Sequence, residues 1–224
     1  MRGCRLKLDK LAAGVVFPDI AEADAQGVLC VSREVTPAFL IAAYSHGIFP
    51  WPVDDDGLIP WFAPPRRALF LFDRFHVSKR TLRYFKSAGF RIRVNGDFET
   101  VMRSCGEVKR SGQRGTWITE RMVNAYVKLF QLGYAECYET LDDAGRLVGG
   151  LYGVRIGDYF AGESMFHLAP NASKFALAKM VERLRGQGMA WMDVQVINPF
   201  LSDLGASEVD RDEFMRLLRV GVGG

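Results

Sequence analysis

Three polar side chains in the second half of the chain carry groups that could hold an amine or move a proton. Glu163 lies in the segment GESMF, and Asp193 and Gln195 lie two positions apart in an apolar, strand-like segment. Because side chains alternate along a strand, Asp193 and Gln195 leave one face while Met192 and Val194 can pack on the other. A carboxylate in such a segment is costly unless it is solvated, paired or used in catalysis. The spacing alone leaves two interpretations open, a hydrogen-bonded structural aspartate and a catalytic one.

Several short motifs accompany these residues along the chain. They are HGIFPW at 46–51, GTWIT at 115–119, GGLYG at 149–153 and NASK at 171–174. From about Gly27 to Phe214 the chain resembles the bacterial leucyl/phenylalanyl-tRNA–protein transferases. The resemblance implies an enzyme that moves Leu or Phe, with Met a further candidate donor, from a charged tRNA to the N-terminal amino group of a protein.

The resemblance implies catalytic positions at Glu163, Asp193 and Gln195. An aminoacyl-tRNA ester is already activated, so peptide-bond formation requires positioning and proton removal, and we expect no cofactor and no metal. A peptide α-amino group has a pKa of about 7.7 to 8.0, so a general base near the amine would help. We expect Asp193 to receive the proton, directly or through Gln195, while Glu163 fixes the amine. Proton transfer through the terminal ribose of the tRNA is the alternative.

The donor side chain requires an apolar pocket, and the terminal adenosine of the tRNA requires an aromatic surface. A hydrophobic pocket separates side chains that differ by one methylene by only about 1 to 3 kcal/mol, so preference among large donors should be graded. Stacking of a base on an aromatic ring contributes about 1 to 3 kcal/mol and tolerates any base. Each of these residues could equally belong to an ordinary core. The resemblance places the pocket at Leu151, Phe160, Leu177, Met180, Leu184 and Met192, and the adenosine site at Trp51 and Trp117.

Positive charge is concentrated in one segment, although the whole chain has a net charge of only +3. Residues 66–93 contain nine Lys and Arg residues against one acid. On the helix predicted within this segment, Lys79, Arg83 and Lys86 share one side. A stripe of this kind fits a phosphate backbone, and it also fits a solvated helix face. The residues that we expect to contact the tRNA backbone are Arg66, Arg67, Lys79, Arg80, Arg83 and Lys86.

The elements that must position these residues follow from hydrophobic periodicity and turn signals. The order of meander, helix and strand predicts an α+β fold. We expect a small N-terminal α/β lobe over residues 1–64, then an acyltransferase-like domain of the GNAT type over residues 65–224, with a mainly antiparallel sheet flanked by helices. A proline-rich segment marks the boundary. The predicted helices lie at about 37–45 and 173–185 and after caps at Ser78, Asp97, Thr119 and Asp210, and the predicted strands at 90–95, 134–141, 147–154, 159–166 and 189–197.

Rival functions fit parts of the same pattern. N-acetyltransferases that use acetyl-CoA share the predicted domain type, and Arg183, Gly186 and Gly188 match their pyrophosphate motif by letter. These residues fall at the C-terminal end of a predicted helix, where carbonyl groups rather than N–H groups are free, so the match is poor. A non-catalytic RNA-binding module would use only the basic helix and the tryptophans. A related transferase with changed specificity would keep the catalytic residues.

The expected partners are aminoacyl-tRNA and acceptor proteins that begin with Arg or Lys, which the resemblance links to N-end-rule degradation. The sequence has no apolar run of about 20 residues and no signal-peptide core, so we expect a cytoplasmic monomer without membrane contact. Its four cysteines and three histidines lack metal-ligand spacing. The departures from the family's usual pattern are Ser32 to Val35 in place of GGDL, Val194 in place of a common Cys, and Phe200 in place of a common His.

Overall fold

The computed structural model describes residues 12, 14–51, 57–108 and 118–223 of the 224-residue chain. Trp117, one of the two expected adenosine contacts, lies outside the described residues. The strands are β1 Val28–Ser32, β2 Phe49–Pro50, β3 Ile59–Phe62, β4 Arg66–Leu71, β5 Arg91–Val94, β6 Ala135–Leu141, β7 Leu147–Ile156, β8 Tyr159–His167, β9 Trp191–Gln195 and β10 Ala206–Asp210. The helices are η1 Ile20–Glu22, α2 Pro37–Ser45, α3 Lys79–Ser87, α4 Phe98–Glu107, α5 Glu120–Gln131, α6 Ala172–Gly186, α7 Pro199–Ser202 and α8 Arg211–Gly223.

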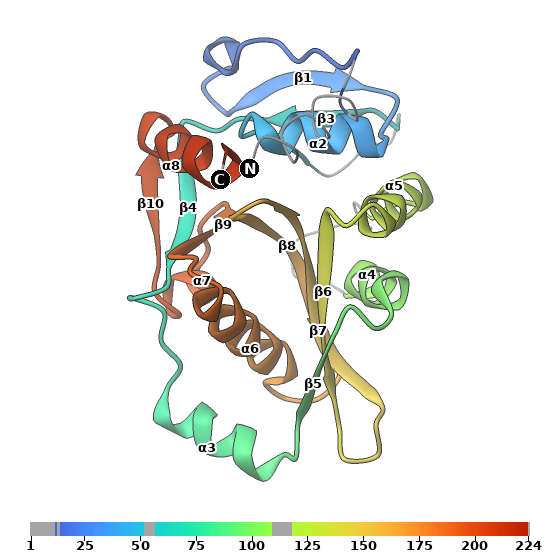
Figure 1. Cartoon of the computed structure of the whole chain (residues 1–224), viewed down its shortest axis with the longest axis vertical. Helices are drawn as coiled ribbons and strands as arrows, with labels where there is room; N and C mark the ends of the chain where they lie inside the picture. The colour runs from blue at the N-terminus through green and yellow to red at the C-terminus, as the bar shows by residue number, and fades with distance from the viewer. Residues whose placement is uncertain (1–11, 13, 52–56, 109–117, 224) are drawn as a thin grey trace.

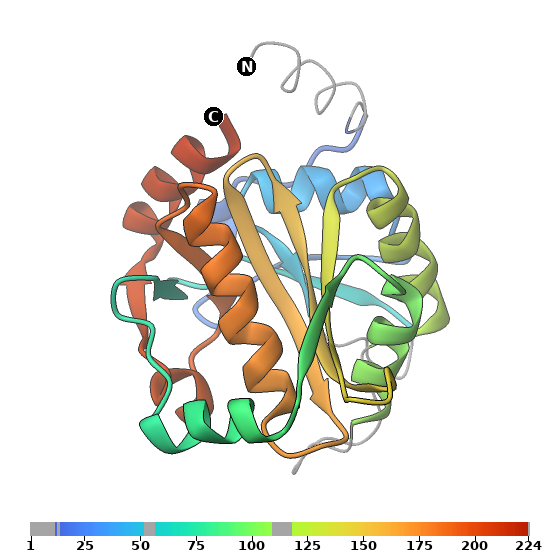
Figure 2. The same cartoon turned by 60° about the horizontal axis from the view of Figure 1, so that its bottom comes forward.

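The large sheet contains seven strands in the order β10-β4-β9-β8-β7-β6-β5. Neighbouring strands are antiparallel except β8 and β9, which run parallel because α6 crosses from the end of one to the start of the other. Helix α6 covers one face of the sheet, and α4 and α5 cover the other (Figure 1 and Figure 2). The predicted α+β class, with a mainly antiparallel sheet flanked by helices, is confirmed.

The N-terminal part forms a smaller sheet in the order β1-β3-β2, on which α2 packs above the end of the large sheet (Figure 1). Its core is continuous with that of the larger part, because Leu40 and Tyr44 of α2 belong to the same hydrophobic cluster as Tyr126 of α5 and Phe214 of α8. The break between the two sheets lies near the boundary expected at residues 64 and 65. Since one core serves both sheets, the division into two domains stays a prediction.

Local capping signals fix several helix starts. Thr36, Ser78, Asp97 and Thr119 each accept a hydrogen bond from a backbone N–H in the first turn of the following helix, as predicted. These bonds satisfy donors that have no partner within the helix. Strands β1 to β4 and β10 and the short helix α7 had no predicted spans, because their segments carry no clear alternation of polar and apolar residues.

Candidate active site

A cavity opens where the parallel strands β8 and β9 separate. Their register contains one pair, Ala161 with Asp193, and β9 ends two residues later at Gln195, whose backbone is left-handed with φ 59°. The chain then turns away into α7, which Asn198 caps. The space left between β8, β9 and α6 is a cavity of about 880 Å³. Its polar wall includes Glu163 and Gln195, and Asp193 does not reach it.

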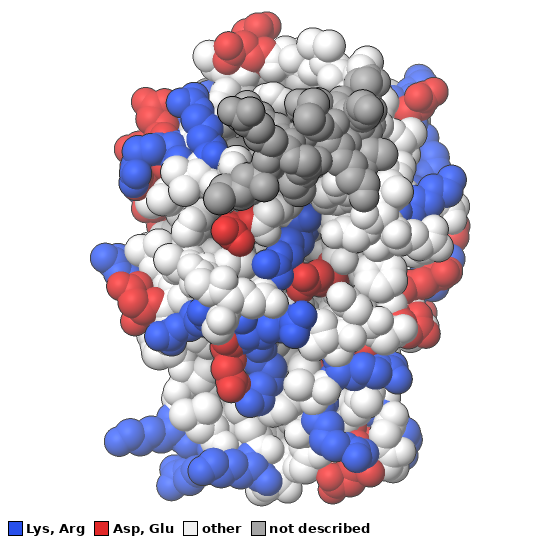
Figure 3. Space-filling model, viewed as in Figure 1, with Lys and Arg blue, Asp and Glu red and all other residues white. Residues whose placement is uncertain are grey.

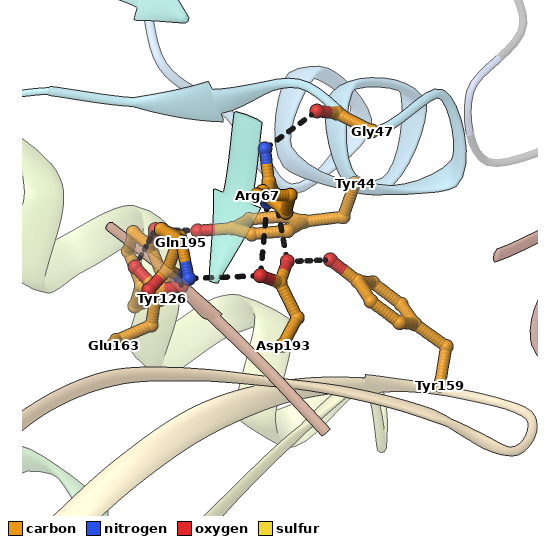
Figure 4. A network of polar contacts seen from close by, with 8 residues as sticks. All are labelled: Tyr44, Gly47, Arg67, Tyr126, Tyr159, Glu163, Asp193 and Gln195. Atoms are coloured by element: carbon orange, nitrogen blue, oxygen red, sulfur yellow. Dashed lines mark hydrogen bonds and ion pairs between the residues drawn. The ribbon is translucent and has the colours of Figure 1, made fainter. Parts of the chain in front are cut away.

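Asp193 is fully buried and lies at the centre of a hydrogen-bond network (Figure 4). Its Oδ1 accepts from Arg67 Nε at 2.9 Å and from the backbone N–H of Gln195 at 2.8 Å. Its Oδ2 accepts from Arg67 Nη2 at 2.7 Å and from the Tyr159 hydroxyl at 2.6 Å. The remaining Arg67 donor, Nη1, binds the carbonyl oxygen of Gly47 at 2.9 Å. Four donors therefore occupy the carboxylate, and the same network fixes the backbone at Gln195.

Glu163 belongs to a second network that faces the cavity (Figure 4). Its Oε1 accepts from Gln195 Nε2 at 2.8 Å, and its Oε2 accepts from the Tyr126 hydroxyl at 3.1 Å. The Tyr44 and Tyr126 hydroxyl oxygens are 2.7 Å apart. Burial raises the pKa of Glu163 to about 7, although the nearby hydroxyl groups of Tyr44 and Tyr126 oppose the shift by stabilising its carboxylate. At neutral pH this carboxyl group is therefore poised to gain or lose a proton.

The apolar wall of the cavity contains most of the expected donor pocket. Phe160 and Leu184 are the exceptions. Both are completely buried in the core that α6 forms with the sheet, and neither lines the cavity. Flexible methionines make the remaining wall adaptable to side chains of different shape. The expected residues that line the cavity are Leu151, Leu177, Met180 and Met192.

Trp51 lines the same cavity from the N-terminal part of the chain. Its ring packs against Phe49 and Phe62, with centroids 5.8 and 5.4 Å away, and 37% of the residue remains exposed. An aromatic ring that is supported on one side and open on another suits base stacking.

The basic residues separate into two groups. Lys79, Arg80, Arg83 and Lys86 are exposed on α3, and Lys and Arg side chains gather over this helix at the lower edge of the molecule (Figure 3). Arg67 differs, because it is 1% exposed and bound to Asp193, so the expectation that it contacts the tRNA backbone is wrong. The exposed Arg66 forms an ion pair with Glu208 at 3.3 Å.

Sequence reasoning missed the tyrosines of both networks, Tyr44, Tyr126 and Tyr159. Each is completely buried, and each occupies a position that reads as ordinary core in its helix or strand. No local signal identifies them, because their partners lie between 34 and 82 residues away along the chain. A buried tyrosine does require a hydrogen-bond partner, which is the only general hint.

Two features are absent from the described part of the chain. It contains no group of three or more His, Cys, Asp or Glu residues that could hold a metal ion. In the same residues no helix is both long and apolar enough to span a bilayer.

A carboxyl group beside an amide, at the wall of an apolar cavity in an α+β fold, suits an enzyme that transfers an acyl group to an amine. The family model "Leucyl/phenylalanyl-tRNA protein transferase" matches residues 69–219, and that of the family's N-terminal domain matches residues 33–65. The leucyl/phenylalanyl-tRNA–protein transferase of Shewanella halifaxensis is 42% identical over 201 residues, which are 90% of this chain and 84% of that protein. The chain belongs to the leucyl/phenylalanyl-tRNA–protein transferase family.

Solved structures of proteins with low sequence identity to this chain resemble its fold only partly. The crystal structure of FemX is 12% identical with a TM-score of 0.48, over 69% of this chain and 64% of that one. A GNAT-family acetyltransferase from Staphylococcus aureus Mu50 is 14% identical with a TM-score of 0.34, over 50% of this chain and 78% of that one.

Proposed function

We propose that the chain transfers Leu or Phe, with Met a further donor, from an aminoacyl-tRNA to the N-terminal amino group of an acceptor protein. Membership of the family supports this class of reaction, with aminoacyl-tRNA and a protein as its two substrates. The observation that carries the proposal is Glu163, a carboxyl group with a pKa of about 7 at the wall of an apolar cavity.

The reaction requires one proton to be moved. The acceptor amine attacks the ester carbonyl, a C–N bond forms, and the C–O bond to the ribose breaks. The proton that the amine loses must reach the leaving ribose oxygen. In our proposal the Glu163 carboxylate accepts this proton and returns it, because a base with a pKa near the working pH serves both steps. Gln195 Nε2, 2.8 Å from Glu163 Oε1, orients the reacting groups.

Asp193 has a positioning function in this proposal instead of the base function expected from the sequence. Its carboxylate already accepts four hydrogen bonds and has no access to the cavity. Removing a proton from a substrate would require breaking at least one of these bonds. Its bond to the backbone N–H of Gln195 instead holds that residue in its left-handed conformation. Proton transfer through the tRNA ribose is the remaining alternative to Glu163.

The other substrate contacts follow from the cavity. We propose that Leu177, Met180 and Met192 contact the donor side chain and that Trp51 stacks on the terminal adenosine. The exposed basic residues of α3 bind phosphates of the tRNA, since they supply affinity without requiring sequence.

The family resemblance alone supports four further features of the proposed function. The acceptors begin with Arg or Lys, the modified proteins are marked for N-end-rule degradation, the enzyme acts in the cytoplasm, and it acts as a monomer. An acidic subsite would suit a basic first residue, because complementary charge supports specificity and association.

The test is transfer of radiolabelled Leu from Leu-tRNA to a protein with N-terminal Arg, without ATP or acetyl-CoA. Wild type should transfer Leu, and Glu163→Gln should reduce kcat/KM by about 100-fold or more, the usual effect of losing a general base. Glu182→Gln is the matched control, because Glu182 is an exposed glutamate on α6 that pairs with Lys179.

Each other outcome has a definite meaning. If tRNA binds tightly and no Leu is transferred to any N-terminus, the chain is a binding module. Transfer to a different N-terminal residue would identify changed acceptor specificity. Full activity of Glu163→Gln would assign the proton to the ribose route.

A further inference from the structure

The start of α6 presents an unused hydroxyl group to the cavity. Ser173 lies in the first turn of this 15-residue helix and is only 5% exposed. It lines the cavity on the same side of the helix as Leu177 and Met180. Its hydroxyl makes no hydrogen bond with any residue that the structure describes, and its oxygen is open to the cavity rather than sealed in the core. A polar ligand in the cavity would supply the missing acceptor.

Two backbone N–H groups without an acceptor in the described part of the chain lie in the same helical turn as this hydroxyl. Asn171, at the N-cap position, is left-handed with φ 60°, and its side chain does not cap the helix. The N–H of Ala172 bonds to the carbonyl of Ala169, whereas those of Ser173 and Lys174 have no acceptor within the described residues. Free N–H groups at a helix start, with the positive end of the helix dipole, attract an anion. The hydroxyl and the two N–H groups make a donor set of the kind that binds a phosphate.

The charges around this helix start are also suited to an anion. Lys174 lies in the first turn, with Nζ 5.4 Å from the ring centre of Phe200, which lines the cavity. On the other side of the segment that leads into α6, a second cavity of about 700 Å³ is lined by Arg80 and Arg83 of α3 and by Asn171. Of all described residues that line either cavity, only Glu163 is acidic. The start of α6 therefore lies between the reaction cavity and the basic helix.

The spacing along β8 is consistent with one substrate reaching both places. Gly149 pairs with His167 at the end of β8, and a Cβ on Gly149 would lie 2.6 Å from that of Ala172, so the helix start lies directly over this pair. From Glu163 to His167 is four residues of strand, or about 13 Å. An extended aminoacyl nucleoside with its 5′ phosphate has a comparable length.

We propose that Ser173 and the free N–H groups of the first turn of α6 bind a phosphodiester group in the single-stranded 3′ end of the donor tRNA. This inference rests on the proposed function. The site holds the strand between the basic face of α3, where the tRNA is anchored, and the cavity, where the ester reacts. It contributes position rather than base specificity, as phosphate contacts do.

The experiment compares two minimal donors, leucyl-CpA with its natural phosphodiester and leucyl-CpA with an uncharged methylphosphonate linkage. The measured quantity is the ratio of kcat/KM for the two donors in transfer to the same protein acceptor. Wild type should prefer the phosphodiester by about tenfold, the usual effect of a charge-assisted hydrogen bond. Ser173→Ala should lower this preference, Ser173→Asp should abolish or reverse it, and Ser173→Thr, which keeps the hydroxyl, should retain it.

The helix dipole favours a carboxylate in the first turn, whereas the low exposure of this position opposes it, so urea denaturation of Ser173→Asp accompanies the kinetic measurement and Ser173→Ala carries the test if that variant does not fold. Ser207→Asp, on the edge strand β10 and away from both cavities, is the matched control and should behave as wild type. An equal ratio in wild type, Ser173→Ala and Ser173→Asp overturns the phosphate site while leaving the proposed function intact. Absence of transfer by wild type from Leu-tRNA and both minimal donors rejects the proposed function itself.

Discussion

Arg67 and Asp193 form a two-pronged ion pair that solvent does not reach, with 1% and 0% of the two residues exposed. The Arg67 guanidinium also lies between the rings of Phe49 and Phe214, 4.4 and 4.5 Å from their centres. Although burial opposes its charge, Asp193 raises the pKa of Arg67 above its ordinary value. Through Arg67 of β4, the pair thus connects the N-terminal part of the chain and helix α8 to the end of β9, where Gln195 lies.

Arg67→Met should be strongly destabilising, because it leaves the Asp193 carboxylate buried without its counter-charge. Breaking a buried pair in this way typically costs about 3 to 5 kcal/mol of unfolding free energy. Urea denaturation provides the measurement. The neighbouring Arg66→Met is a matched control, since the exposed pair of Arg66 with Glu208 should contribute no more than about 1 kcal/mol. Equal losses in the two variants would contradict a structural function of the buried pair.

The comparison of these two arginines shows what a sequence can predict. Adjacent arginines in one basic segment look alike in the sequence. Only the folded structure distinguishes the exposed Arg66 from the buried Arg67, whose partner is 126 residues away. Caps such as Thr36 and Asp97 were predicted because the groups that they satisfy lie within three residues. Contacts that depend on packing between distant elements leave no such local trace.

The same limit applies to the candidate site. The family resemblance implied Glu163, Asp193 and Gln195 as site residues, and the structure brings them together through hydrogen bonds. Their relative access was not predictable, because the donors that occupy Asp193 come from β4 and β8. Four of the six residues expected at the donor pocket line the cavity, but whether a residue faces the cavity or the core depends on where β8 and β9 separate.

Glu163→Gln should stabilise the fold at pH 8. The pKa of Glu163 is about 7 in the folded state, against about 4.3 in an unfolded chain. Between these two pH values Glu163 is protonated in the folded state but ionised in the unfolded chain. The contribution of this group to the unfolding free energy therefore falls as pH rises from about 4.5 to 7, and it stays low above pH 7. Because Glu163 is partly open to the cavity, we expect a gain of about 2 kcal/mol at pH 8 and little difference at pH 4.

Urea denaturation of both proteins across this pH range tests the sign. Glu139→Gln is an informative contrast, because Glu139 is fully buried but paired with Arg93 and bonded to two backbone N–H groups. That variant should lose stability at pH 8. A Glu163→Gln protein that is less stable than wild type at pH 8 would show that the carboxylate is well accommodated and has no raised pKa.

Met180→Ala should change donor selectivity by widening the cavity. The smaller donor side chain loses more contact in a wider pocket, so kcat/KM for Leu should fall more than that for Phe, by up to about tenfold. Leu184→Ala is the control on the same helix. It removes a core side chain that does not line the cavity, so it should lower stability by about 2 to 5 kcal/mol and leave the ratio of Leu to Phe transfer unchanged. A change of selectivity in Leu184→Ala alone would place the pocket deeper than the cavity.

Neutralising the exposed face of α3 should weaken tRNA binding in a way that depends on salt. In the triple variant Lys79→Gln, Arg83→Gln and Lys86→Gln, the three side chains removed are exposed and leave the helix core unchanged. Each lost phosphate contact should reduce the slope of log affinity against log salt concentration by about 0.7 to 0.9. Dissociation constants of Leu-tRNA, measured from about 50 to 200 mM KCl, give that slope. The control is a triple neutralisation of Lys128 and Arg146, which are exposed, and the half-buried Lys179, all on other elements, so that both triple variants lose the same net charge. Identical slopes for the two triple variants would mean that α3 is a solvated face and that the tRNA backbone is bound elsewhere.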